Sequence, residues 1–248
     1  MIKTIKIKIT NFCMNNCSFC IFHDKTEELK FHDIIKIIKA IPKIWKGQII
    51  LNGGEPTLHK DFIAITKYIR NTFPNNRFGL GTNLKLFEFQ NQKTRKVFET
   101  MISNYDLLQV GCDNEHKNIE IVEKLVPVLR KNGKDVYLNC INEFSDKTIK
   151  EKLKALDNNF GSKTAFSPVL NHNEHYIFED IKHKQLCSIR QNDILIDADG
   201  EIYFCFQQSF EKSLGNVKKK GNKELYSIFF ETNIDYLYSA CNKCPYYV

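Results

Sequence analysis

The 248-residue sequence predicts an α/β fold, a partial (β/α)6 TIM-like barrel followed by a small second domain. Short segments rich in Ile, Leu and Val alternate with segments whose apolar residues recur at three- and four-residue spacing. This alternation indicates strands and helices in turn, and therefore a parallel sheet with right-handed crossovers. The character of the chain changes after about residue 170, where a polar stretch precedes a hairpin pattern and a final helix. We expect a first domain over residues 1–170 and a second over residues 171–248.

Six strands are expected in the first domain, each short, apolar and bounded by polar or turn-forming residues. They span residues 5–9, 48–51, 77–80, 107–110, 135–141 and 164–169. Six strands are two short of a closed eight-stranded barrel. We therefore expect the first strand at an edge of the sheet, where Lys6 and Lys8 would discourage aggregation.

Five helices are expected between these strands, because apolar residues recur there at helical spacing. They span residues 33–40, 61–71, 93–102, 119–129 and 145–156. Asp61 is placed to cap the second helix, and Gly133 to stop the fourth, which Pro127 can kink.

In the second domain, a hairpin is expected over residues 193–206 and a helix over residues 223–238. The hairpin turn at Asp199-Gly200 begins like a calcium loop at Asp197, but the final Glu of such a loop is absent. The pattern therefore favours a turn.

The composition is typical of a soluble globular protein, with 42% hydrophobic and 26% charged residues. No stretch approaches the roughly 18 uninterrupted apolar residues of a membrane span, and the first ten residues lack the apolar block of a signal peptide. We therefore expect a cytoplasmic protein without a membrane partner. The net charge of +7 is spread over many lysines, so nucleic acid is not an expected partner.

Nine cysteines are many for a reducing compartment, where clustered cysteines indicate metal binding or catalysis. Cys13, Cys17 and Cys20 follow the first strand within eight residues. Three thiolates can hold three irons of a cubane [4Fe–4S] cluster and leave the fourth iron open to another ligand. On spacing alone, a zinc site completed by His23 and cysteines without a metal are the alternatives.

A second group of four cysteines lies in the second domain, two around the expected hairpin and two in a CxxC pair. They are Cys187, Cys205, Cys241 and Cys244. Four thiols can fill every protein position of a metal site, so a structural zinc ribbon and an auxiliary [4Fe–4S] cluster both fit.

The two remaining cysteines, Cys112 and Cys140, fall at the fourth and fifth strands. Strand alternation turns both away from Asp113 and Asn139, toward the helices, so we interpret them as core thiols. The alternative is a hydrogen-atom donor.

The first cysteine motif, CxxxCxxC with Phe19 before its last cysteine, resembles that of the radical S-adenosylmethionine (SAM) enzymes. Motifs at the ends of the next two strands match the same family. These GGEP and TN motifs are Gly53, Gly54, Glu55 and Pro56, and then Thr82 and Asn83. The combination is far more specific than the cysteine motif alone.

The resemblance implies that Cys13, Cys17 and Cys20 hold a [4Fe–4S] cluster and that SAM chelates its open iron. Phe19 would lie near the adenine, and the backbone of residues 53–55 would meet the methionine amino group, which only glycines allow to approach so closely. One-electron reduction, implied from a flavodoxin or ferredoxin-type partner, would cleave SAM to methionine and a 5′-deoxyadenosyl radical. That radical would take a hydrogen atom from the substrate.

One departure from the family concerns the fourth strand. Many relatives carry Ser-x-Asp there, in contact with SAM, whereas this chain has Gly111-Cys112-Asp113. Asp113 fits the pattern, but the missing serine puts the ribose or carboxylate contact at Gly111 in doubt. On the fifth strand, Asn139 is expected to face the barrel interior as a SAM ligand, with Asn142 as the alternative.

The second cysteine group resembles the C-x(9–15)-G-x4-C opening of SPASM and twitch domains. No cysteine follows Cys244, so the chain is similar to the shorter twitch form, which holds one auxiliary [4Fe–4S] cluster. A cluster ligated fully by protein would accept the electron that a substrate radical must lose in an oxidation.

The relatives that resemble the chain most in length and auxiliary spacing are twitch dehydrogenases of aminocyclitols. A two-electron oxidation of a small hydroxylated molecule is therefore the leading hypothesis, with two [4Fe–4S] clusters and SAM as cofactors. Peptide modification is the alternative, although the cluster motif begins at residue 13 and leaves no room for a leader-binding domain. A non-catalytic zinc protein is the alternative of a different class.

Overall fold

The structure, a computed structural model, describes residues 2–20, 26–167, 193–203 and 213–232. In these residues, nine strands form one sheet in the order β6-β5-β4-β3-β2-β1-β7-β8-β9. The strands are β1 (Thr4–Thr10), β2 (Gln48–Gly53), β3 (Phe78–Thr82), β4 (Leu107–Gly111), β5 (Asp135–Ile141), β6 (Lys163–Ser167), β7 (Asp193–Ile196), β8 (Glu201–Tyr203) and β9 (Gly215–Asn216). All neighbouring pairs from β1 to β6 are parallel, which confirms the predicted partial (β/α)6 barrel.

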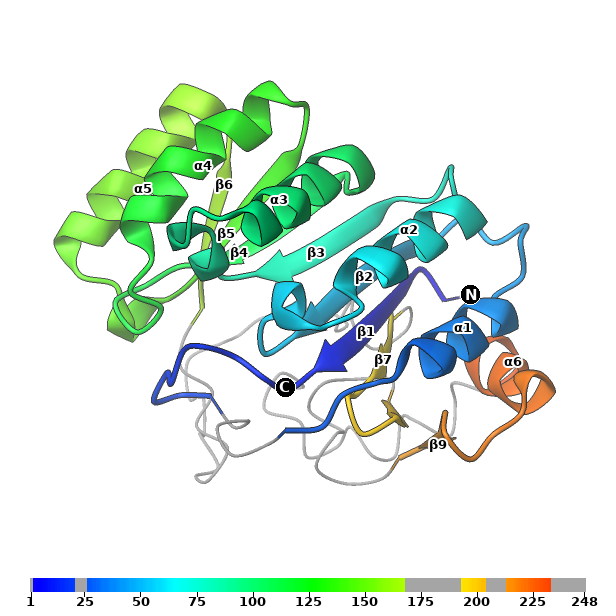
Figure 1. The fold of residues 1–248 in the computed structure, drawn as a ribbon. Coiled ribbons are helices and arrows are strands. Elements are labelled where there is room, and N and C mark those ends of the chain that lie inside the picture. Colours follow the sequence, from blue (N-terminus) through cyan, green and yellow to red (C-terminus); the bar gives the residue numbers. More distant parts are fainter. Residues whose placement is uncertain (1, 21–25, 168–192, 204–212, 233–248) are drawn as a thin grey trace, which may run out of the picture.

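Helices α1 to α5 connect the parallel strands and cover one face of the sheet (Figure 1). The helices are α1 (Phe31–Ala40), α2 (Phe62–Thr72), α3 (Gln92–Asn104), α4 (Ile119–Lys131), α5 (Lys147–Phe160) and α6 (Asn222–Phe230). Three short 3-10 helices follow strands β2, β3 and β5. They are η1 (Pro56–Leu58), η2 (Lys85–Glu88) and η3 (Asn142–Phe144).

Local sequence signals explain most helix ends. Asn91 caps α3 by accepting a hydrogen bond from the Thr94 backbone, and α4 continues past Pro127 to stop before Gly133, which adopts positive φ. Asp61 stands at the predicted N-cap of α2, but its side chain makes no capping hydrogen bond. The expected start of α5 at residue 145 shifts to Lys147, because Asp146 is the residue that caps it.

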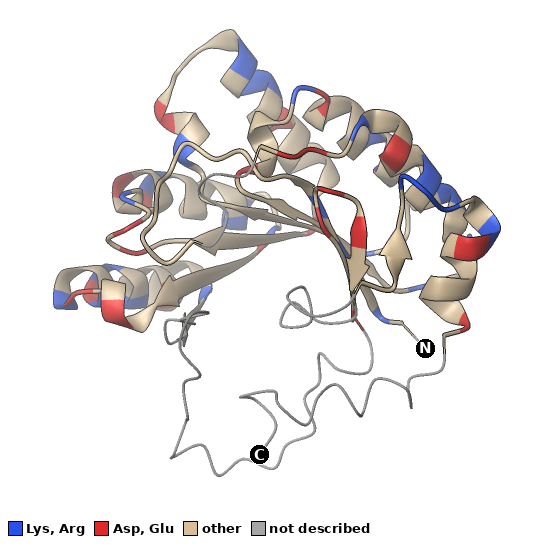
Figure 2. Ribbon diagram, turned by 90° about the horizontal axis from the view of Figure 1, so that it is seen from below, with Lys and Arg blue, Asp and Glu red and all other residues tan. Residues whose placement is uncertain are grey.

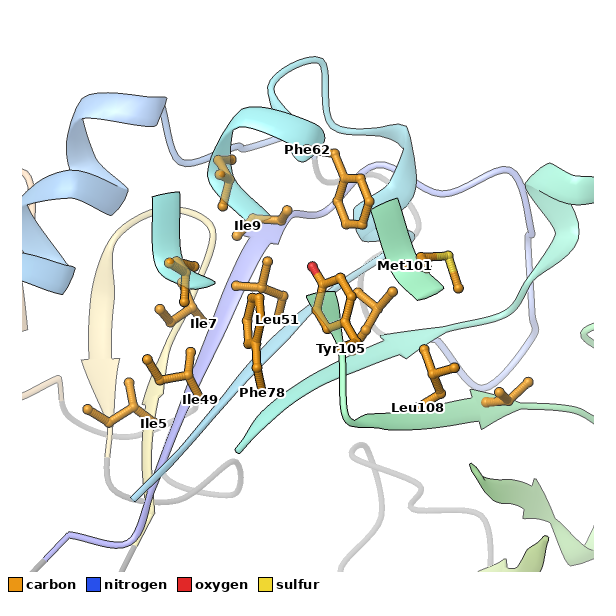
Figure 3. Close-up of a cluster of buried hydrophobic side chains, with 14 of the residues drawn as sticks. Ile5, Ile7, Ile9, Ile49, Leu51, Phe62, Phe78, Met101, Tyr105 and Leu108 are labelled. Atoms are coloured by element: carbon orange, nitrogen blue, oxygen red, sulfur yellow. The ribbon is translucent and has the colours of Figure 1, made fainter. Parts of the chain in front are cut away.

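The core lies between the sheet and these helices (Figure 3). Alternate residues of β1, Ile5, Ile7 and Ile9, point into it and are completely buried. The Tyr105 ring stacks on Phe78 with centroids 4.4 Å apart, and its hydroxyl is 2.7 Å from the Thr66 hydroxyl. Burying such large side chains, each contributing about 1.5–3 kcal/mol, fixes the helices on this face.

The opposite face of the sheet, which we call the inner face, is polar toward the carboxyl ends of its strands. The strand register places Lys8, Asn52, Gly81, Gln109 and Tyr137 in one row across β1 to β5, and Gly111 and Asn139 pair in the next row. Nearer the amino ends of the strands, Ile50, Leu107 and Leu195 lie on the same face. The part of the inner face at the carboxyl ends therefore offers hydrogen-bonding groups.

The prediction that β1 is an edge strand is wrong. β1 lies between β2 and β7 and pairs with both in parallel. Lys6 and Lys8 instead face carboxylates of the neighbouring segment, because Lys6 lies 2.9 Å from Asp193 and Lys8 lies 3.3 Å from Asp197. The two lysines therefore join β1 to the later part of the chain.

The hairpin predicted over residues 193–206 is present where the structure describes it. β7 and β8 pair antiparallel around a turn in which the Gly200 amide donates to the Asp197 carbonyl oxygen, and Gly200 has φ +95°. The final helix, predicted over residues 223–238, starts close to its predicted position, because α6 runs from Asn222 to Phe230. Its predicted end was wrong, since the helix is already capped at Glu231. The domain boundary at 170/171 stays a prediction, because residues 168–192 lie outside the described residues.

Among the helices of the described residues, none is both long and apolar enough to cross a bilayer. Lys and Arg are interspersed with Asp and Glu along the helices in Figure 2, and no single-sign block of charge dominates that view.

Candidate metal and cofactor site

The three cysteines of the first motif lie in one loop, residues 11–20, directly after β1. Cys17 is buried, whereas Cys13 and Cys20 are partly exposed. The loop is held in a turn by the Cys20 amide, which donates to the Cys17 carbonyl oxygen. The Cys13 sulfur accepts from the Asn15 backbone amide and from the side-chain amide of Asn83, both at 3.4 Å. All three thiols are free, as metal ligands must be.

The electrostatics of this loop suit a cationic group. Burial raises the pKa of the Cys13 thiol, and burial followed by the nearby Asp113 carboxylate raises the pKa of Cys17 to about 12. Coulombic repulsion from the neighbouring thiols adds to both shifts. Thiolates are therefore unfavourable here until positive charge is supplied, and iron supplies it when it displaces the thiol protons. The donor set thus fits an iron–sulfur cluster.

Within the described part of the chain, no three His, Cys, Asp or Glu side chains converge as ligands of one metal ion. A cubane cluster presents a separate iron to each thiolate, so its ligands lie farther apart than those of a single zinc. His23, the proposed fourth zinc ligand, lies outside the described residues.

Gly53 and Gly54 bring the end of β2 against the cysteine loop. The Gly54 amide donates to the Thr10 carbonyl oxygen, and the Glu55 amide donates to that of Phe12, both at 2.8 Å. A Cβ at Gly53 would lie 2.5 Å from the Thr10 oxygen, and one at Gly54 2.4 Å from the Asn11 oxygen. The glycines are thus required for the packing of the β2 end against the backbone of the cysteine loop, in addition to any close approach of a ligand.

Glu55 has its carboxylate turned into the protein and completely buried. One oxygen accepts from the Thr57 amide and hydroxyl, the other accepts from the Asn83 amide at 2.7 Å, and the Thr82 hydroxyl lies within 3.0 Å of both. Burial raises the pKa of Glu55 although these donors lower it. Only the backbone of Glu55 is therefore available to a ligand, and Pro56 beside it starts η1.

Asn83 joins three strand ends. Its side-chain amide reaches Cys13, its backbone amide reaches Glu55, and its carbonyl oxygen accepts from the Asn118 side chain at 2.6 Å. The same Asn118 amide donates to the Gly111 carbonyl oxygen at 2.8 Å. Asn83 is thereby fixed between the cysteine loop and the loop that follows β4.

Asp113 forms a pair with His116. Its Oδ1 accepts from the imidazole Nδ1 at 2.8 Å and from the backbone amides of Glu115 and His116, and its Oδ2 accepts from the Ile141 amide. Burial raises the pKa of Asp113, but the hydrogen bonds and charge of His116 outweigh it, so the pKa falls below its usual value. The carboxylate of Asp113 is thus occupied within the protein, and its expected SAM contact stays a prediction.

Phe19 lies between His116 and Phe144, with ring centroids at 5.7 and 5.5 Å. Asn139 is exposed on the inner face, in register with Gly111, as strand alternation predicted. Asn142 is also exposed, at the start of η3. Their contacts with SAM remain predictions.

Some site residues were missed by sequence reasoning, because each acts through a contact far along the chain. The Glu115 carboxylate accepts from the Ser18 amide at 2.8 Å, and the Asn15 side chain donates to the His116 carbonyl oxygen at 3.3 Å. These contacts clamp the loop after β4, residues 112–118, onto the cysteine loop. The sequence signal was the Asp113-x-x-His116 spacing, which places two complementary side chains one turn apart.

The second cysteine group, Cys187, Cys205, Cys241 and Cys244, lies outside the described residues, as do His172 and His175. Nothing in the structure tests that ligand set. It remains a prediction from the spacing and the resemblance.

The comparison with family models identifies the chain. The model of the radical SAM superfamily matches residues 7–164, which is more than half of the sequence. The chain belongs to the radical SAM superfamily. The SPASM model, an iron–sulfur cluster-binding domain, matches residues 187–245. Together the two matches imply SAM, a [4Fe–4S] cluster and an auxiliary iron–sulfur cluster.

Curated relatives match only part of this radical SAM chain. A probable GTP 3′,8-cyclase of Thermoplasma volcanium is 36% identical over 29% of this chain and 23% of its own length. The GTP 3′,8-cyclase of Haemophilus influenzae strain 86-028NP is 32% identical over 32% of this chain and 25% of its own. The matched segment thus spans about a quarter of each relative, so these matches do not indicate the substrate of this chain.

Solved structures match over nearly the whole radical SAM chain at low identity. SuiB of Streptococcus suis bound to S-adenosylmethionine has a TM-score of 0.64 and 13% identity, over 99% of this chain and 69% of its own. Native anSMEcpe with bound AdoMet and a Cp18Cys peptide has a TM-score of 0.65 and 16% identity, over 96% and 82%. BtrN in complex with AdoMet and 2-DOIA has a TM-score of 0.58 and 14% identity, over 99% and 89%. At these identities the likeness shows the fold alone.

Proposed function

We propose that this radical SAM enzyme catalyses the two-electron oxidation of a small hydroxylated molecule in the cytoplasm. The polar inner face of the sheet is the observation that carries this proposal. Amide side chains of Asn52, Gln109 and Asn139 lie on that face, on β2, β4 and β5. An amide both donates and accepts hydrogen bonds, as a hydroxyl group does, so such a face suits a ligand rich in hydroxyls.

The glycines of the inner face make room for neighbouring side chains. Gly79, Gly81 and Gly111 share this face on β3 and β4. A Cβ at Gly79 would meet Ile50 at 3.2 Å, one at Gly81 would meet the Asn52 carboxamide oxygen at 2.4 Å, and one at Gly111 would meet His116 at 2.8 Å. The polar side chains of Asn52 and His116 therefore lie over the strand backbones, where they could meet a ligand.

In this proposal, Cys13, Cys17 and Cys20 hold the [4Fe–4S] cluster that binds SAM. Phe19 would meet the adenine, the backbone of residues 53–55 the methionine amino group, and Asn139 the nucleoside from the inner face. The cysteine loop and the end of β2 would be positioned by Thr82, Asn83 and the Glu55 carboxylate. The Glu55 carboxylate accepts from the Thr82 hydroxyl and the Asn83 backbone amide, and the Asn83 side chain donates to Cys13. When bound and reduced, the cluster and SAM supply a 5′-deoxyadenosyl radical.

In the proposed oxidation, a carbinol carbon of the substrate would give a hydrogen atom to the radical that SAM supplies, which would leave as 5′-deoxyadenosine. The hydroxyl proton would go to a base and the remaining electron to the auxiliary cluster, so that the carbinol becomes a carbonyl. Cys187, Cys205, Cys241 and Cys244, within or at the SPASM match, are the proposed ligands of that cluster. A flavodoxin or ferredoxin-type protein would supply the electron that cleaves SAM.

The experiment that tests the reaction uses the full chain, reconstituted without oxygen and reduced by dithionite, with polyols deuterated at the carbinol carbons. We expect one deuterium in 5′-deoxyadenosine and a carbonyl product that is lighter than the deuterated substrate by one deuterium and one hydrogen, in a one-to-one ratio. Gln109→Ala should weaken turnover, whereas Gln92→Ala, on the exposed start of α3, should not. Deuterium transfer without a carbonyl product would contradict oxidation and leave radical formation intact.

Peptide modification is the second candidate, because two of the solved neighbours were determined with peptides bound, the precursor peptide SuiA and the Cp18Cys peptide. The same deuterium assay distinguishes it. A change of mass in an added peptide, with no turnover of polyols, would support the peptide candidate.

The metal content tests the proposed ligands. Two filled cubane sites correspond to about eight irons per chain with an absorption band near 400 nm. Cys13→Ala should remove about half of that iron, while Cys112→Ala, whose thiol lies in the core, should retain it. Zinc in place of iron in anaerobically purified protein would support the non-catalytic alternative.

A further inference from the structure

Hydrogen bonds to the thiols of the cysteine loop converge on one sulfur. Within the part of the chain that the structure describes, Cys13 is the cysteine of the first motif whose sulfur accepts hydrogen bonds. One comes from the Asn15 backbone amide and one from the Asn83 side chain, both at 3.4 Å. The first bond is local, whereas the second joins the cysteine loop to the residue that follows β3. Asn83 is therefore a donor that the fold, and not the local turn, brings to this sulfur.

The orientation of the Asn83 amide is fixed by its oxygen. The Oδ1 atom accepts from the Lys85 backbone amide at 2.9 Å, in the turn that an Asn side chain makes with the backbone two residues on. The Nδ2 atom, which can only donate, then points to Cys13. The backbone of Asn83 is anchored as well, because its amide donates to Glu55 and its carbonyl oxygen accepts from Asn118.

This donor lies in a shielded place. Asn83 is 5% exposed, and Asn118, which donates to its carbonyl oxygen, is 1% exposed. A hydrogen bond in such a low-dielectric environment is electrostatically stronger than the same bond in water. The Asn83 amide therefore has more effect on the charge of the Cys13 sulfur than a solvent-exposed donor would have.

Cys17, in contrast, lies near negative charge. Burial raises the pKa of its thiol most, and the charges of Asp113 and, less strongly, Glu115 add to the shift. The Glu115 carboxylate is held at the loop because it accepts from the Ser18 amide at 2.8 Å. A reduced cluster carries one more negative charge than an oxidised one, so these carboxylates oppose its reduction. Donors at Cys13 act in the opposite direction.

We propose that the Asn83 side chain raises the reduction potential of the SAM-binding cluster by donating a hydrogen bond to the Cys13 thiolate. This bond stabilises the reduced cluster more than the oxidised one, because the reduced cluster has more negative charge on its sulfurs. The transfer of one electron from a flavodoxin or ferredoxin-type protein thereby becomes more favourable. Asn83 acts on the reaction only through Cys13. This inference rests on the cluster ligands proposed above.

The test is a redox titration of the reconstituted full chain without SAM, followed by electron paramagnetic resonance. SAM added afterwards identifies the signal of the cluster that binds it, and the auxiliary cluster serves as an internal reference. Asn83→Ser keeps an oxygen that can accept from the Lys85 amide but is too short to donate to Cys13. At a fixed potential, this variant should hold about three- to tenfold less reduced cluster, the effect of one hydrogen bond. That ratio corresponds to a midpoint potential about 30–60 mV lower.

Two further variants separate this role from a structural one. Asn83→Ala loses both hydrogen bonds of the side chain, so its midpoint potential should equal that of Asn83→Ser if the bond to Cys13 is the cause. Asn91→Ser is the matched control, because the Asn91 side chain accepts a backbone amide in a similar way but caps α3, and serine is also a good cap. Its midpoint potential should equal that of the wild type.

The outcomes distinguish this inference from the proposed function. A wild-type chain in which no signal responds to SAM overturns the proposed function. If the wild-type signal responds and Asn83→Ser has the same midpoint potential, only the role of Asn83 is overturned. A midpoint potential lower in Asn83→Ala than in Asn83→Ser would assign the effect to the turn at Lys85 instead.

Loss of the cluster in a variant is also decisive. If Asn83→Ser holds no cluster, Asn83→Asp takes its place, because aspartate has the same shape, keeps the acceptor for Lys85 and has no donor for Cys13. Its midpoint potential should again be lower than that of the wild type. If neither variant holds a cluster, Asn83 acts in cluster assembly and the inference is overturned.

Discussion

The thiols of Cys112 and Cys140 lie 3.4 Å apart at the ends of neighbouring strands, and both side chains are sealed in the core. The hydrogen bond to Cys140, and burial after it, raise the pKa of Cys112 well above its usual value. Both thiols belong to the hydrophobic cluster on the helical side of the sheet, whereas Asn139 beside them is exposed on the inner face. The two cysteines therefore lie on the side of the sheet opposite to the proposed substrate face.

This arrangement predicts that neither thiol donates a hydrogen atom to substrate. Cys112→Ala and Cys140→Ala should each reduce the free energy of unfolding by about 1 kcal/mol, the cost of one buried thiol-sized group. Urea titration of the cluster-free protein measures that loss. The rate of 5′-deoxyadenosine formation should stay within twofold of the wild type, and a variant that forms 5′-deoxyadenosine without product would contradict the structural role.

The sequence was sufficient to predict the strands and helices of the parallel sheet, because hydrophobic periodicity and glycine or capping residues are local signals. Gly133 stops α4 and Asp199-Gly200 turns the hairpin where expected. The place of β1 in the sheet was not predictable in the same way. Its pairing with β7 joins segments nearly two hundred residues apart, and the lysines of β1 resemble edge residues until their aspartate partners are known.

The candidate site could be proposed from the sequence where a motif carries the chemistry, as for the three cysteines and for Gly53 and Gly54. It was not predictable where a side chain acts through the fold. Nothing in the sequence indicates that the Glu55 carboxylate binds Thr82 and the Asn83 backbone, because that contact forms only when β2 and β3 lie side by side.

Glu55→Gln should destabilise the protein. The carboxylate accepts hydrogen bonds on both oxygens, and a glutamine amide would place donors against the donors of Thr57 or Asn83. An unsatisfied buried group costs about 1–3 kcal/mol, so we expect a loss of that size in the free energy of unfolding. Glu88→Gln, at the exposed end of η2, is the control and should leave stability unchanged. Equal stability of the two variants would show that the buried network contributes little.

Asp146 should make stability depend on pH in acid. The Ile149 backbone amide and, next, the Asn114 side chain donate to its carboxylate and lower its pKa below the ordinary 3.8. The unfolded chain then binds more protons than the folded one, so this contribution is complete above about pH 4 and is lost as the pH falls through the lowered pKa.

Asp146→Asn keeps a capping oxygen without a charge, so the melting temperature of the variant should approach that of the wild type as the pH falls from 6 to 3. Circular dichroism of the cluster-free protein measures both. Asp61→Asn is the matched control, since Asp61 holds the N-cap position of α2 without bonding the start of the helix. A difference between wild type and Asp146→Asn that stays constant over this range would contradict the prediction.

Of the two ion pairs between β1 and the segment that begins with β7, the pair of Lys8 with Asp197 should contribute more to the free energy of unfolding than the pair of Lys6 with Asp193. Both side chains are nearly buried, with exposed fractions of 4% and 11%, whereas the Lys6 side chain beside Asp193 is 30% exposed. Removing one member of a buried pair leaves an uncompensated charge, which costs about 3–5 kcal/mol, while a surface pair contributes about 0–1 kcal/mol. Lys8→Met should therefore destabilise the protein far more than Lys6→Met in urea unfolding.

The double variant Lys8→Met/Asp197→Asn tests the cause. Asparagine keeps the oxygen that accepts the Ala198 amide at 2.6 Å but carries no charge, so the buried carboxylate no longer lacks a counter-ion. We expect the double variant to recover most of the stability lost in Lys8→Met, although each change removes one partner of the pair. If the double variant is as unstable as Lys8→Met, or if Lys6→Met is equally unstable, the lysine stabilises β1 through packing of its aliphatic chain instead of its charge.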